Sequence, residues 1–320
     1  MDTPNEAESR RLEALRFAMG PIIPYLDDDR VIEIALNADG SIWVERQGEV
    51  MARTKARMSS ADAMRMLLLV ANHMNTELTP AKPSLAALIP GWQTRLQAMI
   101  PPVVEGPTFT IRKPPKQIFT LDNYVERGIV SADQADLIRR AVADRSNILV
   151  GGSTGAGKTT FANAILHEIA TQTRDRLYIV EDMRELQCSA PNKLQVFVQE
   201  PTYGWQRAIM DALRSRPDRI IVGEVRGGAA ALELIKAWNT GHPGGLATIH
   251  ANDTRAMLDR VCQLLEEVTL NPPRLFLAQT INLCIHIALD RRHPAGRRLS
   301  GVDRVKGLNS DLSWQLEPVA

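Results

Sequence analysis

Residues 152–159 read Gly-Ser-Thr-Gly-Ala-Gly-Lys-Thr and match the pattern G-x-x-x-x-G-K-[ST] at every fixed position. The five residues before the stretch, 147–151, are mostly apolar and predict a buried strand. After the stretch, Phe161, Ile165 and Leu166 recur at helical spacing and predict a helix. A strand, a glycine-rich turn and a helix in this order form the context in which the pattern binds nucleoside triphosphates.

The chemistry of phosphate binding explains these residue types. Glycines let the backbone curl so that its N–H groups point at a phosphate, and the following helix adds the positive end of its dipole. We expect the Lys158 ammonium to reach the β- and γ-phosphates and the Thr159 hydroxyl to bind Mg²⁺. The residues predicted to bind ATP are Gly152, Ser153, Thr154, Gly155, Ala156, Gly157, Lys158, Thr159 and Thr160.

The length, charge and cysteine content of the chain limit the other interpretations. A chain of 320 residues is long enough for roughly two domains. The formal net charge of +1 gives no global basic field, so strong direct binding of nucleic acid is not expected. The three cysteines are far apart and form no C-x-x-C pair, which suits a reducing cytoplasm.

The sequence predicts a cytoplasmic protein whose contact with a membrane is at most peripheral. No apolar run approaches the ~20 residues that span a bilayer, and the acidic start, residues 2–8, does not fit a signal peptide. A predicted helix at 6–19 carries Leu12, Leu15 and Met19 on one side and arginines elsewhere. Such a helix either lies on a membrane surface or packs on its own domain.

Residues 1–112 are predicted to form a small α+β domain. Ser59 is placed to cap a helix that runs through about Met74, with apolar residues on one face. Alternating and apolar runs, with a glycine turn between the first two, predict four strands at 31–37, 41–46, 95–100 and 108–112.

A boundary follows this domain. Pro114 and Pro115 stiffen the chain and cannot continue a helix or strand, so 113–145 are predicted to be a linker and connecting helices. From residue 146 to 320 strands alternate with helices, which implies an α/β domain with a mostly parallel sheet.

Acidic residues stand at the ends of two predicted strands of the α/β domain. Glu224 follows strand 219–223, and we expect it to position and deprotonate the attacking water. The alternative is an acid that caps a neighbouring helix. Three acids follow strand 177–180: Glu181, Asp182 and Glu185. They are predicted to hold Mg²⁺, some of them through water, and the alternative is a solvated turn.

Two histidines flank a third strand, 245–249. His250 follows its end, where carboxyl ends of parallel strands bind ligands, and is predicted to sense the γ-phosphate or order a loop. His242 precedes the strand, and the sequence does not decide between a functional and a structural role for it.

Together these features resemble the secretion-traffic ATPases of type II and type IV secretion. The likeness extends from about Val31 to Leu289 and rests on four motifs in the family's order. They look like its Walker A, Asp box, Walker B and His box, and they lie at 151–160, 181–186, 213–226 and 240–251.

The resemblance implies a RecA-like P-loop NTPase domain at the carboxyl end, preceded by an α+β domain. It also implies Mg²⁺-dependent hydrolysis of ATP by a ring of six subunits, with the nucleotide bound between the two domains. Family members contact phosphate through arginines of the N-terminal domain. Arg112 is the first candidate here and Arg95 the second, and the alternative is a surface arginine on a strand edge.

The lack of a tetracysteine zinc site in the sequence indicates which branch of the family this chain resembles. Type II secretion members usually carry a tetracysteine zinc site, which this chain does not have, so it resembles the conjugation and type IV secretion branch. That likeness implies a motor for pilus assembly or DNA transfer, with inner-membrane components of the apparatus as partners. Three alternatives remain open: a nucleic-acid translocase, a pilus-retraction motor, and a scaffold without catalysis.

Overall fold

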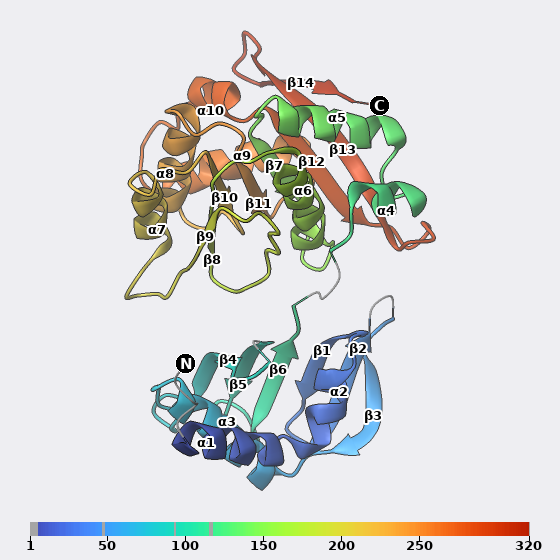
Figure 1. The fold of residues 1–320 in the computed structure, drawn as a ribbon, viewed down its shortest axis with the longest axis vertical. Helices are drawn as coiled ribbons and strands as arrows, with labels where there is room; N and C mark the ends of the chain where they lie inside the picture. The colour runs from blue at the N-terminus through green and yellow to red at the C-terminus, as the bar shows by residue number, and fades with distance from the viewer. Residues whose placement is uncertain (1–5, 47–48, 93, 115–117, 320) are drawn as a thin grey trace. The chain divides into compact units, whose positions relative to one another are not determined.

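The structure, a computed structural model, describes residues 6–46, 49–92, 94–114 and 118–319. It divides into two compact units, Met1–Lys116 and Gln117–Ala320 (Figure 1). The helices of the first unit are α1 (Glu6–Ala18), the 3₁₀ turn η1 (Gly20–Ile22), α2 (Ile23–Asp27) and α3 (Ser60–His73). Its strands are β1 (Val31–Leu36), β2 (Ser41–Arg46), β3 (Ala52–Arg57), β4 (Ser84–Ile89), β5 (Thr94–Met99) and β6 (Thr108–Arg112).

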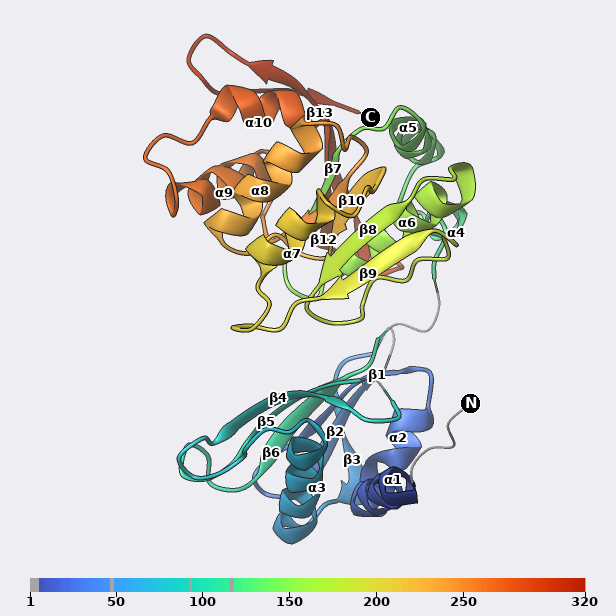
Figure 2. The ribbon, with the colours of Figure 1, turned by 60° about the vertical axis from the view of Figure 1, so that its left-hand side comes forward.

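The first unit is an antiparallel sheet with helices on one face, as Figure 2 shows. Its strand order is β3-β2-β1-β6-β5-β4. Apolar residues of α1, α3 and alternate strand positions form one buried cluster, because side chains alternate between the faces of a strand. The predicted helix cap is confirmed, since the Ser59 hydroxyl accepts a hydrogen bond from the Asp62 N–H at 3.1 Å. The strands β3 and β4 were not predicted.

The second unit is built on an eight-stranded sheet with helices on both faces. Its helices are α4 (Leu121–Glu126), α5 (Ala132–Ala143), α6 (Lys158–Gln172), α7 (Trp205–Ala212), α8 (Gly228–Asn239), α9 (Thr254–Glu266) and α10 (Arg274–Thr280). Its strands are β7 (Ile148–Gly151), β8 (Leu177–Glu181), β9 (Lys193–Phe197), β10 (Arg219–Val222), β11 (Leu246–Ile249), β12 (Leu283–Leu289), β13 (Arg297–Leu308) and β14 (Trp314–Pro318).

The strand order of this sheet is β14-β13-β12-β7-β11-β10-β8-β9. The strands from β12 to β9 pair in parallel, whereas β13 and β14 add antiparallel pairs at one edge. The central strands β7, β10 and β11 are buried along their whole length, which explains why they appear in the sequence as continuous apolar runs.

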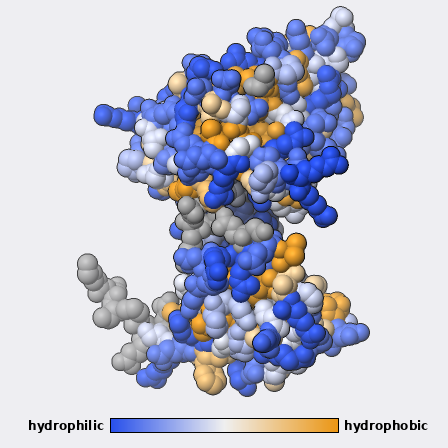
Figure 3. All heavy atoms as spheres, turned by 90° about the vertical axis from the view of Figure 1, so that its right-hand side faces the viewer, coloured by the Kyte–Doolittle hydropathy of each residue, from blue (hydrophilic) through white to orange (hydrophobic). Residues whose placement is uncertain are grey.

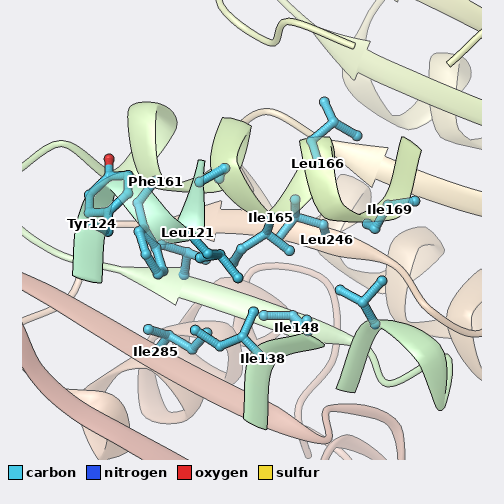
Figure 4. Close-up of a cluster of buried hydrophobic side chains, with 14 of the residues drawn as sticks. Leu121, Tyr124, Ile138, Ile148, Phe161, Ile165, Leu166, Ile169, Leu246 and Ile285 are labelled. Carbon is cyan, nitrogen blue, oxygen red and sulfur yellow. The ribbon is translucent and has the colours of Figure 1, made fainter. Parts of the chain in front are cut away.

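Alternate residues of the buried strands face two different hydrophobic clusters. On one face, Ile148 and Val150 of β7 join side chains of α4, α5 and α6 (Figure 4). On the other face, Leu149 packs with side chains of α7, α8, α9 and α10. Packing on both faces holds the carboxyl ends of the strands at one rigid edge, which is where an open α/β sheet binds its ligands.

Helices α4 and α5, expected in the connecting segment, pack on the second unit. Both begin with a capping box, built on Thr120 and Ser131. The Tyr124 ring of α4 meets the Phe161 ring of α6 edge-on, with centroids 5.0 Å apart (Figure 4). The chain between residues 118 and 145 therefore supports the helix that follows the glycine-rich loop.

The surface of the second unit is mainly hydrophilic on the side shown in Figure 3, with apolar side chains in limited groups. Across the part of the chain that the structure describes, no helix has both the length and the apolar character that are needed to cross a bilayer.

Candidate nucleotide-binding site

Four neighbouring strands bring the predicted site residues to one edge of the sheet. The strands are β7, β11, β10 and β8, in that spatial order, and they run parallel. The glycine-rich loop follows β7, and His250, Glu224 and Asp182 follow the ends of β11, β10 and β8. Residues that are up to about a hundred positions apart in the sequence therefore meet at the carboxyl ends of the strands.

The glycine-rich loop has a backbone that fits a phosphate. Gly155 and Gly157 adopt φ angles of +76° and +98°, which L side chains rarely adopt. Gly157 is the N-cap of α6, and no side chain of the described residues caps this helix. The first N–H groups of a helix have no partner within that helix, and helix N-termini of this kind bind anions.

The other residues of the loop differ in their exposure. Ser153 and Thr154 are exposed in the loop, whereas Thr159 and Thr160 lie half-buried in the first turn of α6. The Ala156 N–H donates to the Ser153 carbonyl at 3.2 Å, which closes the turn of the loop. Binding of phosphate by these residues remains a prediction.

Lys158, His250 and Glu224 form a continuous chain of polar contacts. The Lys158 ammonium lies 3.2 Å from His250 Nδ1 and also donates to the Ser153 carbonyl at 3.1 Å. His250 Nε2 lies 2.9 Å from Glu224 Oε1. Since an ammonium can only donate, Nδ1 accepts, and Nε2 carries the proton that points at the carboxylate.

The surroundings of His250 favour the neutral imidazole. Burial lowers the pKa of His250 below its usual value, and the positive charges of Lys158 and Arg226 lower it further. The Glu224 carboxylate acts in the opposite direction but does not reverse the effect. His250 thus connects the loop lysine to the strand-end acid as a neutral bridge.

Arg226 completes this chain of contacts, a role that the sequence did not predict. Its Nε donates to Glu224 Oε2 at 2.8 Å, a second nitrogen also donates to that oxygen, and Nη1 donates to Asp182 Oδ2 at 2.7 Å. Both oxygens of Glu224 are therefore occupied by protein donors. An arginine two residues after a strand-end acid was the only signal in the sequence that could have pointed to this role.

Glu181 has a different set of partners from those predicted. Its Oε2 accepts hydrogen bonds from the N–H groups of Glu185 and Leu186 at 2.9 and 2.8 Å, and its Oε1 accepts one from the Gln195 amide. Burial raises the pKa of Glu181 to about 7, although these hydrogen bonds oppose the rise. The carboxylate holds the loop after β8, and binding of Mg²⁺ by Glu181 stays a prediction.

The remaining candidates for Mg²⁺ are Thr159, Asp182 and Glu185, which are half-buried. In the described ranges, no three carboxylate, histidine or cysteine side chains converge in a way that would hold a metal ion. Binding of Mg²⁺, which keeps several waters and uses few protein ligands, stays a prediction for these residues.

The structure does not bring His242 to this edge. His242 lies before β11, at the amino end of the strand, whereas His250 lies at the carboxyl end. Its Nδ1 is buried without a hydrogen-bond partner among the described residues. The position of His242 therefore separates it from the other candidates.

The predicted arginines lie in the first unit. Arg95 of β5 and Arg112 of β6 are paired across the sheet, and Arg112 is also paired with Glu33 of β1. All three side chains lie on the face opposite the helices, since their neighbours Leu96 and Ile111 face the core. Contact between these arginines and a phosphate remains a prediction.

The fold and the site together define an α/β nucleotide-binding protein. A family model described as "Type II/IV secretion system protein" matches residues 18–292. The chain therefore belongs to the type II/IV secretion system protein family, the secretion ATPases, as its four motifs predicted.

Two relatives refine this assignment. The chain is 40% identical over 299 residues to the probable conjugal transfer protein TrbB of Sinorhizobium fredii, covering 93% of this chain and 90% of that protein. It is 30% identical over 337 residues to the type IV secretion system protein PtlH of Bordetella pertussis, covering 93% and 97%. These relatives confirm the predicted conjugation and type IV secretion branch.

A solved structure of the pilus retraction motor PilT with bound ADP shares the fold. The TM-score is 0.68 at 20% sequence identity, and the match covers 93% of this chain and 84% of that one.

Proposed function

We propose that this chain is a Mg²⁺-dependent ATPase that powers a conjugation or type IV secretion apparatus. The observation that carries the proposal is the contact chain from Lys158 through His250, Glu224 and Arg226 to Asp182, beside the glycine-rich loop. It joins the ends of four parallel strands around one point. The proposed active form is a ring of six subunits on the cytoplasmic face of the inner membrane, docked on membrane components of the apparatus.

Each residue of the site has a proposed role. The loop N–H groups and Lys158 bind the phosphates of ATP, and Thr159 and Asp182 orient Mg²⁺, partly through water. Bound Mg²⁺ would neutralise charge on the transferring phosphoryl group. Arg112 and Arg95, which are paired across the sheet of the first unit, are the proposed source of further positive charge for the phosphates.

Glu224 is the proposed base that takes a proton from the attacking water. His250 and Arg226 donate to both of its oxygens, so a water that approaches Glu224 competes with these donors for the lone pairs of the carboxylate. Lys158 offers the trigger, since a phosphate competes with His250 Nδ1 for the same ammonium. Nucleotide binding would then loosen His250 and release Glu224 Oε1.

The test compares ATP hydrolysis and native mass for wild type, Lys158→Ala and Glu224→Gln, each with and without Mg-ATP. We expect ring-sized particles that hydrolyse ATP, loss of nucleotide binding in Lys158→Ala, and hydrolysis slowed about 100-fold or more with binding retained in Glu224→Gln. Glu233→Gln is the matched control, because Glu233 lies on α8 and pairs with Lys236.

Three results would count against the proposal. A monomer that binds ATP but never hydrolyses it would indicate a scaffold or switch. Hydrolysis stimulated strongly by DNA, together with salt-dependent DNA binding, would indicate a nucleic-acid translocase. Unchanged hydrolysis in Glu224→Gln would remove Glu224 as the base.

A further inference from the structure

Arg297, the first residue of β13, lies directly against the glycine-rich loop. Its Nη1 donates a hydrogen bond to the Ala156 carbonyl at 3.3 Å. The same guanidinium fills the space beside Gly157, so that a Cβ on this glycine would collide with it. Arg297 therefore contacts the last turn of the loop from a strand that is 140 residues away in the sequence.

The contact acts on the peptide that joins Ala156 to Gly157. A charged donor on the carbonyl of a peptide polarises it and strengthens the N–H at its other end, because hydrogen bonds in a chain reinforce one another. The N–H at the other end of this peptide belongs to Gly157, immediately before α6. Loop N–H groups at this position are the ones that would face a phosphate.

The charge of Arg297 is also not neutralised by an acid. Among the described residues no carboxylate pairs with its guanidinium, whereas the next residue, Arg298, pairs with Asp290 at 3.0 Å. The Lys158 ammonium and the positive end of the α6 dipole lie at the same loop. Arg297 therefore adds positive charge to a loop where Lys158 and the helix dipole already favour an anion, whereas Glu224 and Asp182 contact His250 and Arg226.

We propose that Arg297 is a positioning residue of the phosphate site. It acts through the Ala156–Gly157 peptide and through its unpaired charge, and it raises the affinity of the loop for the phosphates of ADP and ATP. The inference rests on the proposed nucleotide-binding function and adds β13 to the elements that build the site.

The test is the dissociation constant for ADP and for ATP, measured by calorimetry at low and at moderate salt. The proteins are wild type, Arg297→Gln, Arg297→Lys and the control Arg298→Gln, which removes a positive charge one residue away. We expect Arg297→Gln to weaken ADP binding about tenfold, equal to about 1.4 kcal/mol, and to reduce its salt dependence. Arg297→Lys should recover most of the affinity, and Arg298→Gln should bind within about twofold of wild type.

Thermal melting without nucleotide separates this role from a structural one. A residue that only stabilises the fold would lower the melting temperature in Arg297→Gln and leave the affinity of the folded protein unchanged. That result would overturn the inference, and so would equal losses in the Lys and Gln variants with the salt dependence of wild type.

The outcome for wild type distinguishes failure of the inference from failure of the proposed function. If wild type binds nucleotide, Lys158→Ala does not, and Arg297→Gln binds like wild type, only the inference fails. If wild type binds no nucleotide, both the proposed function and the inference fail.

Discussion

The Glu181 carboxylate gives the sharpest test of how this site is built. It is almost fully buried at the end of β8, where burial raises its pKa from 4.5 to about 7. Since one pKa unit is worth about 1.4 kcal/mol, the rise amounts to about 3 kcal/mol. The unfolded chain ionises Glu181 near pH 4.5 and the folded chain only near pH 7. The contribution of Glu181 to stability is therefore complete below pH 4.5 and is lost as the pH rises to about 7.

We expect Glu181→Gln to remove this loss of stability at higher pH. The neutral amide keeps an oxygen for the N–H groups of Glu185 and Leu186 but has no charge to bury. Between pH 4.5 and pH 8 the free energy of unfolding of the variant should rise by about 3 kcal/mol relative to wild type. Urea denaturation, followed by tryptophan fluorescence of the second unit, measures this difference.

A matched control is Glu185→Gln, which removes a half-buried carboxylate from the same loop. Because Glu185 is less buried than Glu181, a pH dependence equal to that of Glu181→Gln would contradict the importance of burial. The reasoning is refuted if wild type and Glu181→Gln show the same pH dependence. It is also refuted if Mg²⁺ at pH 8 stabilises wild type but not Glu181→Gln, because Glu181 would then bind the metal as the sequence predicted.

Three further changes test the fold and the contact chain. Arg219→Met should lower the free energy of unfolding by about 3–5 kcal/mol, which urea denaturation measures. The buried guanidinium pairs with Asp175 at 2.6 Å and donates to two backbone carbonyls, and all these contacts are lost. Wild type should lose stability as the pH falls below 6.5, because burial and Lys158 lower the pKa of folded His250, so that protonation favours the unfolded chain. His250→Gln should reduce this loss, and melting curves from pH 5 to 8 measure the effect. Ser59→Ala should cost about 1 kcal/mol of unfolding free energy in urea, because α3 loses its cap.

Each of these changes has a control on a similar residue. Arg145→Met removes the second, more exposed partner of Asp175, and a cost equal to that of Arg219→Met would contradict the importance of burial. His293→Gln removes a histidine that contacts Gly128 and Ala295 outside the contact chain, and a change with pH equal to that of His250→Gln would contradict the role of Lys158. Ser60→Ala removes a hydroxyl one residue past the cap, and a cost equal to that of Ser59→Ala would contradict the capping argument.

The sequence predicted the strand-end residues well because their signals are local. Apolar runs of four or five residues followed by Glu224 or His250 identify both a buried strand and its polar end. The parallel sheet then places these ends together, as the contact of His250 with Lys158 and with Glu224 shows. The partners of Glu181 could not be predicted in this way, because they depend on how the following loop turns back over the carboxylate.

The strands β9, β13 and β14 had no clear signal for a similar reason. They lie at the two edges of the sheet, and their burial is partial or irregular, so the alternation of polar and apolar residues is weak. Their positions depend on pairing with strands that are already buried.

By itself the sequence determined the family, the phosphate-binding type of loop and the polar residues that end three buried strands. Patterns of adjacent residues encode these features, since a loop and a strand end depend on local backbone geometry. Only the tertiary structure decided which side chains touch: Arg226 between Glu224 and Asp182, and Arg297 against Ala156. Contacts of this kind depend on the order of strands in the sheet and on the path of the chain beyond them, which no short stretch of sequence contains.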